Sequence, residues 1–116
     1  MQPERVKLRI VLVDDERPAR DDLRRLMAAH SELEVVGEAG DAVTAEYVVR
    51  RLDPDVLFLD IEMPGATGFE LLDRLTDPPR VIFVTAYDQH AVRAFEVNAL
   101  DYLLKPVHPE RLDLTV

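Results

Sequence analysis

The stretch from Val56 to Gly65 constrains the fold of this chain more than any other. Four apolar residues, Val-Leu-Phe-Leu, run directly into Asp60, and the turn residues Pro64 and Gly65 follow shortly after. A short apolar run bounded by turn residues is typical of a strand that is buried on both faces. Asp60 is therefore expected at the carboxyl end of a central strand, where open parallel α/β sheets bind their ligands.

Strands and helices are expected to alternate along the rest of the chain. The apolar runs predict strands at 8–13, 33–39, 56–60, 81–84 and 102–104, with 33–39 at a sheet edge. Helical spacing of apolar residues, with Pro and Asp at the boundaries, predicts helices at 18–29, 42–52, 68–75 and 88–98, and the start of a fifth at 108–116. Helix-length connections between strands require crossovers, so we expect one α/β domain with a parallel sheet and helices on both faces.

The composition excludes several functional classes. The chain has no cysteine, which rules out disulfides and thiolate metal sites. Its formal net charge of −9 opposes direct binding to nucleic acid or to an anionic membrane surface, so any action on DNA would require another domain. No apolar run is long enough to span a membrane, and the first residues do not resemble a signal peptide. We expect a cytoplasmic protein.

Polar residues follow four of the predicted strands. They are Asp14 with Asp15, Asp60, Thr85 and Lys105, and a parallel sheet brings such positions to one edge. Three carboxylates close together require a cation or a proton, and oxygen ligands without His or Cys favour Mg²⁺. With a hydroxyl and an ammonium group nearby, the set suits the binding of a phosphoryl group, and an aspartate can also accept one covalently. Each residue alone has an ordinary explanation as a helix cap, turn residue or surface residue, and only their joint occurrence favours a site.

Four motifs at these positions resemble a known family. They are Val13-Asp14-Asp15-Glu16, Leu59-Asp60-Ile61-Glu62-Met63-Pro64-Gly65, Thr85-Ala86 and Asp101-Tyr102-Leu103-Leu104-Lys105-Pro106. Together they are similar to the receiver domain of bacterial two-component response regulators, and residues 85–102 are similar to the LytR/AlgR type, in which a DNA-binding domain usually follows. The resemblance implies a flavodoxin-like, doubly wound sheet with strand order 2-1-3-4-5. It also implies that residues 1–116 form a receiver domain without an output domain.

The resemblance further implies a role for each site residue. Asp60 would accept a phosphoryl group from a phosphohistidine of a sensor histidine kinase. Asp15, Asp60 and the backbone carbonyl of Glu62 would bind Mg²⁺ directly, and Asp14 would act through a metal-bound water. The phosphoryl oxygens would be held by Lys105, Thr85 and the backbone N–H of Ala86.

Other positions would transmit the signal or border the site. Thr85 and Tyr102 would form the switch that changes the surface made by the fourth helix, last strand and fifth helix. A cis peptide bond before Pro106 would aim Lys105 at the site, and Glu62 and Tyr87 would border the path of the water that removes the phosphate.

The C-terminus departs from the family pattern. Only residues 108–116 remain for a fifth helix, and Leu112, Leu114 and Val116 alternate more like a strand. We therefore expect a truncated or altered helix that leaves apolar surface uncovered, and hence a homodimer or larger species.

Two rival functions compete with the switch. They are a receiver-shaped dimerisation module that takes no phosphate, and a Mg²⁺-dependent phosphatase of the haloacid dehalogenase kind. That class carries Asp-x-Asp on its first strand, whereas Asp60 follows the third strand with a glutamate two positions on. We interpret His30, His90 and His108 as surface residues without partners, and Phe58, Phe69, Phe83 and Phe95 as core.

Overall fold

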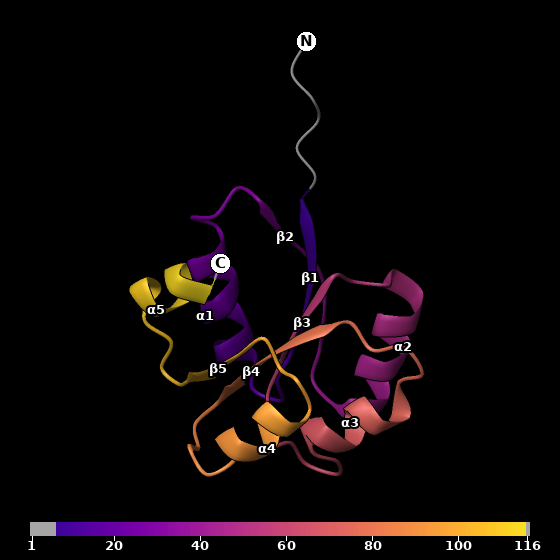
Figure 1. Cartoon of the computed structure of the whole chain (residues 1–116). Helices are drawn as coiled ribbons and strands as arrows, with labels where there is room; N and C mark the ends of the chain where they lie inside the picture. The colour runs from indigo at the N-terminus through magenta and orange to yellow at the C-terminus, as the bar shows by residue number, and fades with distance from the viewer. Residues whose placement is uncertain (1–6, 116) are drawn as a thin grey trace.

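The computed structural model describes residues 7–115, and five parallel strands form a single sheet within them (Figure 1). The sheet order is β2-β1-β3-β4-β5, which confirms the expected flavodoxin-like topology with the weaker strand at an edge. The strands are β1 (Leu8–Val13), β2 (Leu33–Ala39), β3 (Val56–Leu59), β4 (Arg80–Thr85) and β5 (Asp101–Leu104). Since β1, β3 and β4 lie in the interior of the sheet, their side chains are buried on both faces.

Helices cover both faces of this sheet, as the crossover argument predicts. They are α1 (Arg17–Met27), α2 (Ala42–Leu52), α3 (Gly68–Arg74), α4 (Ala91–Glu96) and α5 (Pro109–Thr115). In Figure 1, α1 and α5 lie on one side of the sheet and α2 and α3 on the other. The fold is therefore doubly wound.

Alternate residues along each central strand enter two separate cores. Phe58 of β3 packs with Leu23 of α1 and Leu112 of α5 on one face. Leu57 packs on the opposite face, with Val49 of α2 and Phe69 of α3. This alternation explains why the central strands contain continuous apolar runs: beyond the first residues of β1 and β4, every position along them faces one core or the other.

The fourth helix differs in its bounds from the sequence-based expectation. α4 begins at Ala91 rather than near Asp88, and the chain leaves it at Asn98, whose φ of 61° lies in the left-handed region. Phe95 is 83% exposed, so its assignment to the core is wrong. Ala94 is the residue of α4 that packs into the core, whereas the larger apolar residues of the helix, Val92 and Phe95, face solvent.

The C-terminal residues are helical, so the strand-like alternation is misleading. α5 contains seven residues, Leu112 is fully buried and Leu114 is exposed. Arg111 and Thr115 lie one helical turn apart, and both contact Asp101 of β5, with Arg111 Nη2 2.7 Å from Asp101 Oδ1. This anchor holds α5 in place as a short helix. The remaining residue of the predicted alternation, Val116, lies outside the described residues.

Within residues 7–115, none of the helices has both the length and the apolar character that crossing a membrane requires.

Candidate functional site

Three carboxylates meet at the carboxyl edge of the sheet. Asp60 directly follows β3, and Asp14 and Asp15 directly follow β1, which pairs with β3. One oxygen from each of the three lies within 4.8 Å of the others. Asp14 and Asp60 are only 2% and 4% exposed, whereas Asp15 is exposed. The edge thus presents an all-oxygen cluster that is half enclosed, and this donor set fits a hard divalent cation such as Mg²⁺.

Lys105 brings a positive charge into this cluster from the end of β5. Its Nζ lies 2.6 Å from Asp14 Oδ2 and 3.3 Å from Asp60 Oδ2. Its backbone N–H donates to the Thr85 carbonyl at 2.8 Å, and the Lys105–Pro106 peptide bond is cis. The lysine side chain therefore bridges the two buried carboxylates.

Burial and charge shift the pKa values of this group. Burial first, and the neighbouring Asp14 carboxylate second, raise the pKa of Asp60 to about 6, although Lys105 opposes the shift. Burial lowers the pKa of the Lys105 ammonium, but its contacts with Asp14 and Asp60 outweigh that effect and the net pKa is raised. The cluster thus carries more negative charge than Lys105 alone can balance, and a bound cation would relieve it.

A pocket of about 360 Å³ opens above Asp60. Its lining includes five of the predicted site residues, together with Tyr87: Asp15, Asp60, Glu62, Ala86 and Lys105. Asp14 lies behind the pocket, in contact with Lys105. The pocket is wide enough to admit a phosphoryl group beside the carboxylate.

The predicted switch residues lie beside this pocket rather than in its lining. Thr85 is fully buried at the end of β4, and the Tyr87 N–H donates weakly to its Oγ1 at 3.4 Å. The Tyr102 hydroxyl donates to the Tyr87 carbonyl. Thr85 and Tyr102 are thus connected through the loop that leads from β4 to α4.

Two contacts at the site were not predicted from the sequence. Arg20 Nη1 donates to the Asp14 carbonyl at 2.6 Å, and Arg20 Nε donates to Glu38 of β2 at 2.8 Å. His90 Nε2 lies 2.7 Å from Glu62 Oε1, so the interpretation of His90 as a residue without a partner is wrong. The same correction applies to His30, whose Nε2 lies 2.8 Å from Asp113 Oδ1.

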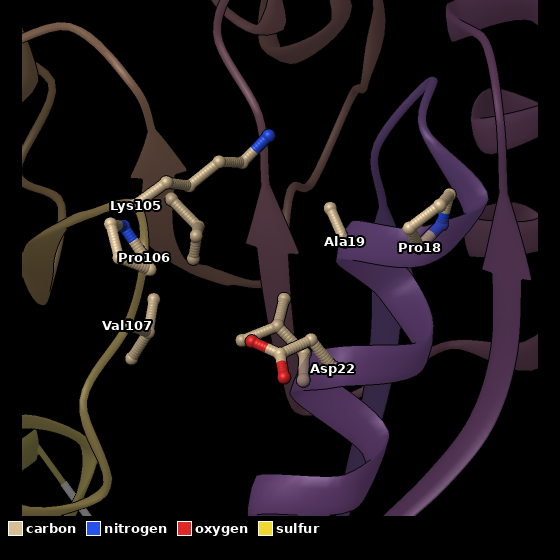
Figure 2. A pocket seen from close by; sticks show the side chains of 8 residues that line it. Pro18, Ala19, Asp22, Lys105, Pro106 and Val107 are labelled. Atoms are coloured by element: carbon tan, nitrogen blue, oxygen red, sulfur yellow. The ribbon is translucent and has the colours of Figure 1, made fainter.

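A second hollow, of about 430 Å³, adjoins Lys105 on the side of α1. Figure 2 shows Pro106 and Val107 on one side of it, and Pro18, Ala19 and Asp22 of α1 on the other. Lys105 belongs to the lining of both hollows. The first turn of α1 and the segment after β5 therefore flank the approach to the site.

Known proteins are similar to this chain in sequence and in fold. Residues 10–116 match the family model of the response regulator receiver domain. An uncharacterized response regulatory protein of Vibrio cholerae is 54% identical over 112 residues, and the transcriptional regulatory protein BtsR of Escherichia coli is 46% identical. Each match covers 94% of this chain, which spans about half of the relative's length (47% and 46%).

Solved structures give the same result. The response regulatory domain of mrkE from Klebsiella pneumoniae superposes with a TM-score of 0.83 at 33% identity, over 93% of this chain and 91% of that one. The response regulator domain of CheB from Thermotoga maritima has a TM-score of 0.78 at 30% identity, over 94% of this chain and 88% of that one. This chain belongs to the response regulator receiver domain family.

Proposed function

We propose that this receiver is a phosphorylation-controlled switch and that Asp60 accepts its phosphoryl group. The observation that carries the proposal is the convergence of Asp60, Asp14, Asp15 and Lys105 around one pocket. The donor is a phosphohistidine of a sensor histidine kinase, a partner that family membership supports. The site lies in the cytoplasm, where such kinases have access to ATP.

The transfer itself requires little covalent chemistry from the protein. An oxygen of Asp60 attacks the phosphorus, an O–P bond forms, and the P–N bond of the phosphohistidine breaks with its electron pair left on the imidazole. Catalysis therefore depends on positioning and on neutralising charge. Lys105 holds a phosphoryl oxygen, while the Thr85 hydroxyl and the Ala86 N–H hold others.

Asp15, Asp60 and the carbonyl of Glu62 would hold Mg²⁺, with Asp14 acting through water. When bound, the cation supplies neutralisation of the incoming phosphoryl oxygens. Its ligands fit the chemistry of the site because every donor is an oxygen and the three carboxylates lie close together, with one oxygen of each within 4.8 Å of the others.

The phosphorylated site controls an output through the surface made by α4, β5 and α5. New charge-assisted hydrogen bonds draw Thr85 toward the phosphoryl group, and Tyr102 follows because its hydroxyl is bonded to the intervening loop at Tyr87. Relatives named as transcriptional regulators, and the LytR/AlgR-like motifs at 85–102, support a DNA-binding output domain in a longer protein. The acidic receiver itself would not bind DNA.

Intact mass spectrometry after incubation with acetyl phosphate tests this function. We expect a gain of one phosphoryl group in the wild type with Mg²⁺, and none without it. Asp60→Asn should abolish the gain, while Asp73→Asn, which changes an exposed aspartate of α3, should retain it. A wild type that takes no phosphate under these conditions would favour the alternative function, a dimerisation module. Turnover of phosphate esters by the wild type would instead indicate a phosphatase.

A further inference from the structure

His90 and Glu62 join two loops on the rim of the Asp60 pocket. Glu62 lies two residues beyond Asp60, between β3 and α3, and His90 immediately precedes α4. Their side chains approach to 2.7 Å between Nε2 and Oε1. Glu62 belongs to the lining of the pocket, and its side chain is 44% exposed. Its carboxylate is thus within reach of the pocket but is directed toward α4.

The His90 ring is held by its surroundings and is not a freely rotating surface side chain. It meets the Phe69 ring in a T-shaped arrangement, with 6.2 Å between the ring centroids, and the Arg93 guanidinium lies 4.2 Å from the centroid of the same Phe69 ring. Phe69 itself is buried in the core against Phe83. The histidine therefore presents Nε2 to Glu62 from a fixed position.

The charges at the pocket give this contact a consequence. Asp15, Glu16, Asp60 and Glu62 all line the pocket, and Lys105 is the one cation among its lining residues. Phosphoryl donors are anions, so a further mobile carboxylate over the pocket would repel them. A partner that fixes Glu62 on the α4 side removes this repulsion.

We propose that His90 is a positioning residue that holds the Glu62 carboxylate aside and so keeps the pocket open to an anionic phosphoryl donor. The inference rests on the proposed function, because it concerns access to the same carboxylate. His90 does not contact the reacting atoms, and it acts only through Glu62.

The matched variants are His90→Phe, which keeps an aromatic ring against Phe69 but removes the nitrogen, and the double variant His90→Phe/Glu62→Gln. With saturating Mg²⁺ and low salt, we expect His90→Phe to slow phosphorylation by acetyl phosphate about two- to fivefold, as one carboxylate brought closer to the donor implies. The double variant should react faster than His90→Phe, because it lacks the freed carboxylate. The loss in His90→Phe should also shrink as salt is raised, because screening weakens the repulsion. His108→Phe, which changes an exposed histidine elsewhere, should react like the wild type.

A second readout does not depend on phosphorylation. A freed Glu62 carboxylate adds negative charge beside the acidic cluster, so His90→Phe should bind Mg²⁺ about twofold or more tightly, and the double variant should not. Wild-type values for both rate and Mg²⁺ affinity in His90→Phe would overturn the inference, as would a double variant as slow as His90→Phe. If the wild type takes no phosphate but the Mg²⁺ affinities of the two variants differ from it as expected, the proposed function fails while the positioning role of His90 stands.

Discussion

Asp60 is held where its ionised form is costly in the absence of a cation. Its folded-state pKa of about 6 lies above the ordinary 3.8 because of burial and the charge of Asp14. The folded state therefore binds the Asp60 proton more tightly than the unfolded state. This contribution to the free energy of unfolding falls as pH rises between about 4 and 6, and the full penalty remains above that window.

The first prediction is that Asp60→Asn stabilises the metal-free protein at neutral pH. The amide cannot ionise, and Lys105 keeps its shorter contact with Asp14. We expect a gain of roughly 1–3 kcal/mol in the free energy of unfolding at pH 7.5, since each pKa unit corresponds to about 1.4 kcal/mol. Urea unfolding in a chelator measures it, and the gain should shrink at pH 4. A variant less stable than the wild type at pH 7.5 would contradict the prediction.

Arg20 supports the same site from behind. It is the residue that fastens the Asp14 carbonyl to Glu38 of β2, and its side chain is only 16% exposed. Within residues 7–115, Arg24 also contacts Glu38 but forms no hydrogen bond with Asp14, which makes it a matched control.

The second prediction is that Arg20→Ala weakens Mg²⁺ binding while Arg24→Ala does not. Without the guanidinium, the segment that carries Asp14 and Asp15 loses a charge-assisted bond and its geometry loosens. We expect a loss of about 1–2 kcal/mol in the free energy of unfolding and a several-fold loss of Mg²⁺ affinity for Arg20→Ala. Calorimetric titration with Mg²⁺ measures the affinity, and equal losses in the two variants would refute a specific role for Arg20.

At the scale of elements, α3 begins against the strand that carries Asp60. Thr67 caps the helix through a reciprocal pair with Glu70, and the N–H of Gly68 donates to the Ile61 carbonyl at 2.9 Å. A Cβ added at Gly68 would lie 2.5 Å from the Asp60 carbonyl oxygen and 3.3 Å from the Ile61 Cα. Both are backbone atoms, so they cannot move aside without displacing Asp60.

The third prediction is that Gly68→Ala impairs both stability and phosphorylation. The backbone contact requires α3 or the segment after β3 to shift, and such overpacking costs about 1–3 kcal/mol. Gly40→Ala is the control for stability, because the nearest atom to its Cβ is the flexible end of the Arg20 side chain at 3.4 Å and not the backbone. Thermal unfolding and the acetyl phosphate reaction measure the two effects. A Gly68→Ala protein with wild-type stability would show that the helix can shift freely.

The elements differ in how far the sequence could predict them. β1, β3 and β4 were predictable because buried strands leave long apolar runs, and the convergence of the acidic residues after β1 and β3 was predictable because parallel strands share one carboxyl edge. α4 and α5 were predicted as helices, but the bounds of α4 and the helical end of α5 were not, because Phe95 and Leu114 are apolar yet exposed, which blurs the helical period. The roles of Arg20 and His90 could not be predicted either, since both act through side-chain directions between elements that are distant in the sequence.

At the scale of the whole molecule, the exposed apolar side chains concentrate around α4 and β5. Val92 and Phe95 of α4 are 72% and 83% exposed, and Leu100 and Leu104 are about half exposed. Phe95 and Leu100 line the same shallow hollow together with Tyr102. This surface adjoins Tyr102, so self-association there would be coupled to the proposed switch.

The last prediction is that this surface mediates the dimer expected from the sequence. A two-fold interface would place the Phe95 side chains of two copies against each other's exposed α4–β5 surface, where burial of two large rings is favourable. Phe95→Asp should therefore lower the apparent mass toward the monomer, because it would bury two like charges. Val43→Asp makes the same kind of change at a 73% exposed position on α2 and should leave association intact. Light scattering over a concentration series measures the association. A wild type that stays monomeric throughout would refute the dimer, and equal effects of the two variants would show that the interface lies elsewhere.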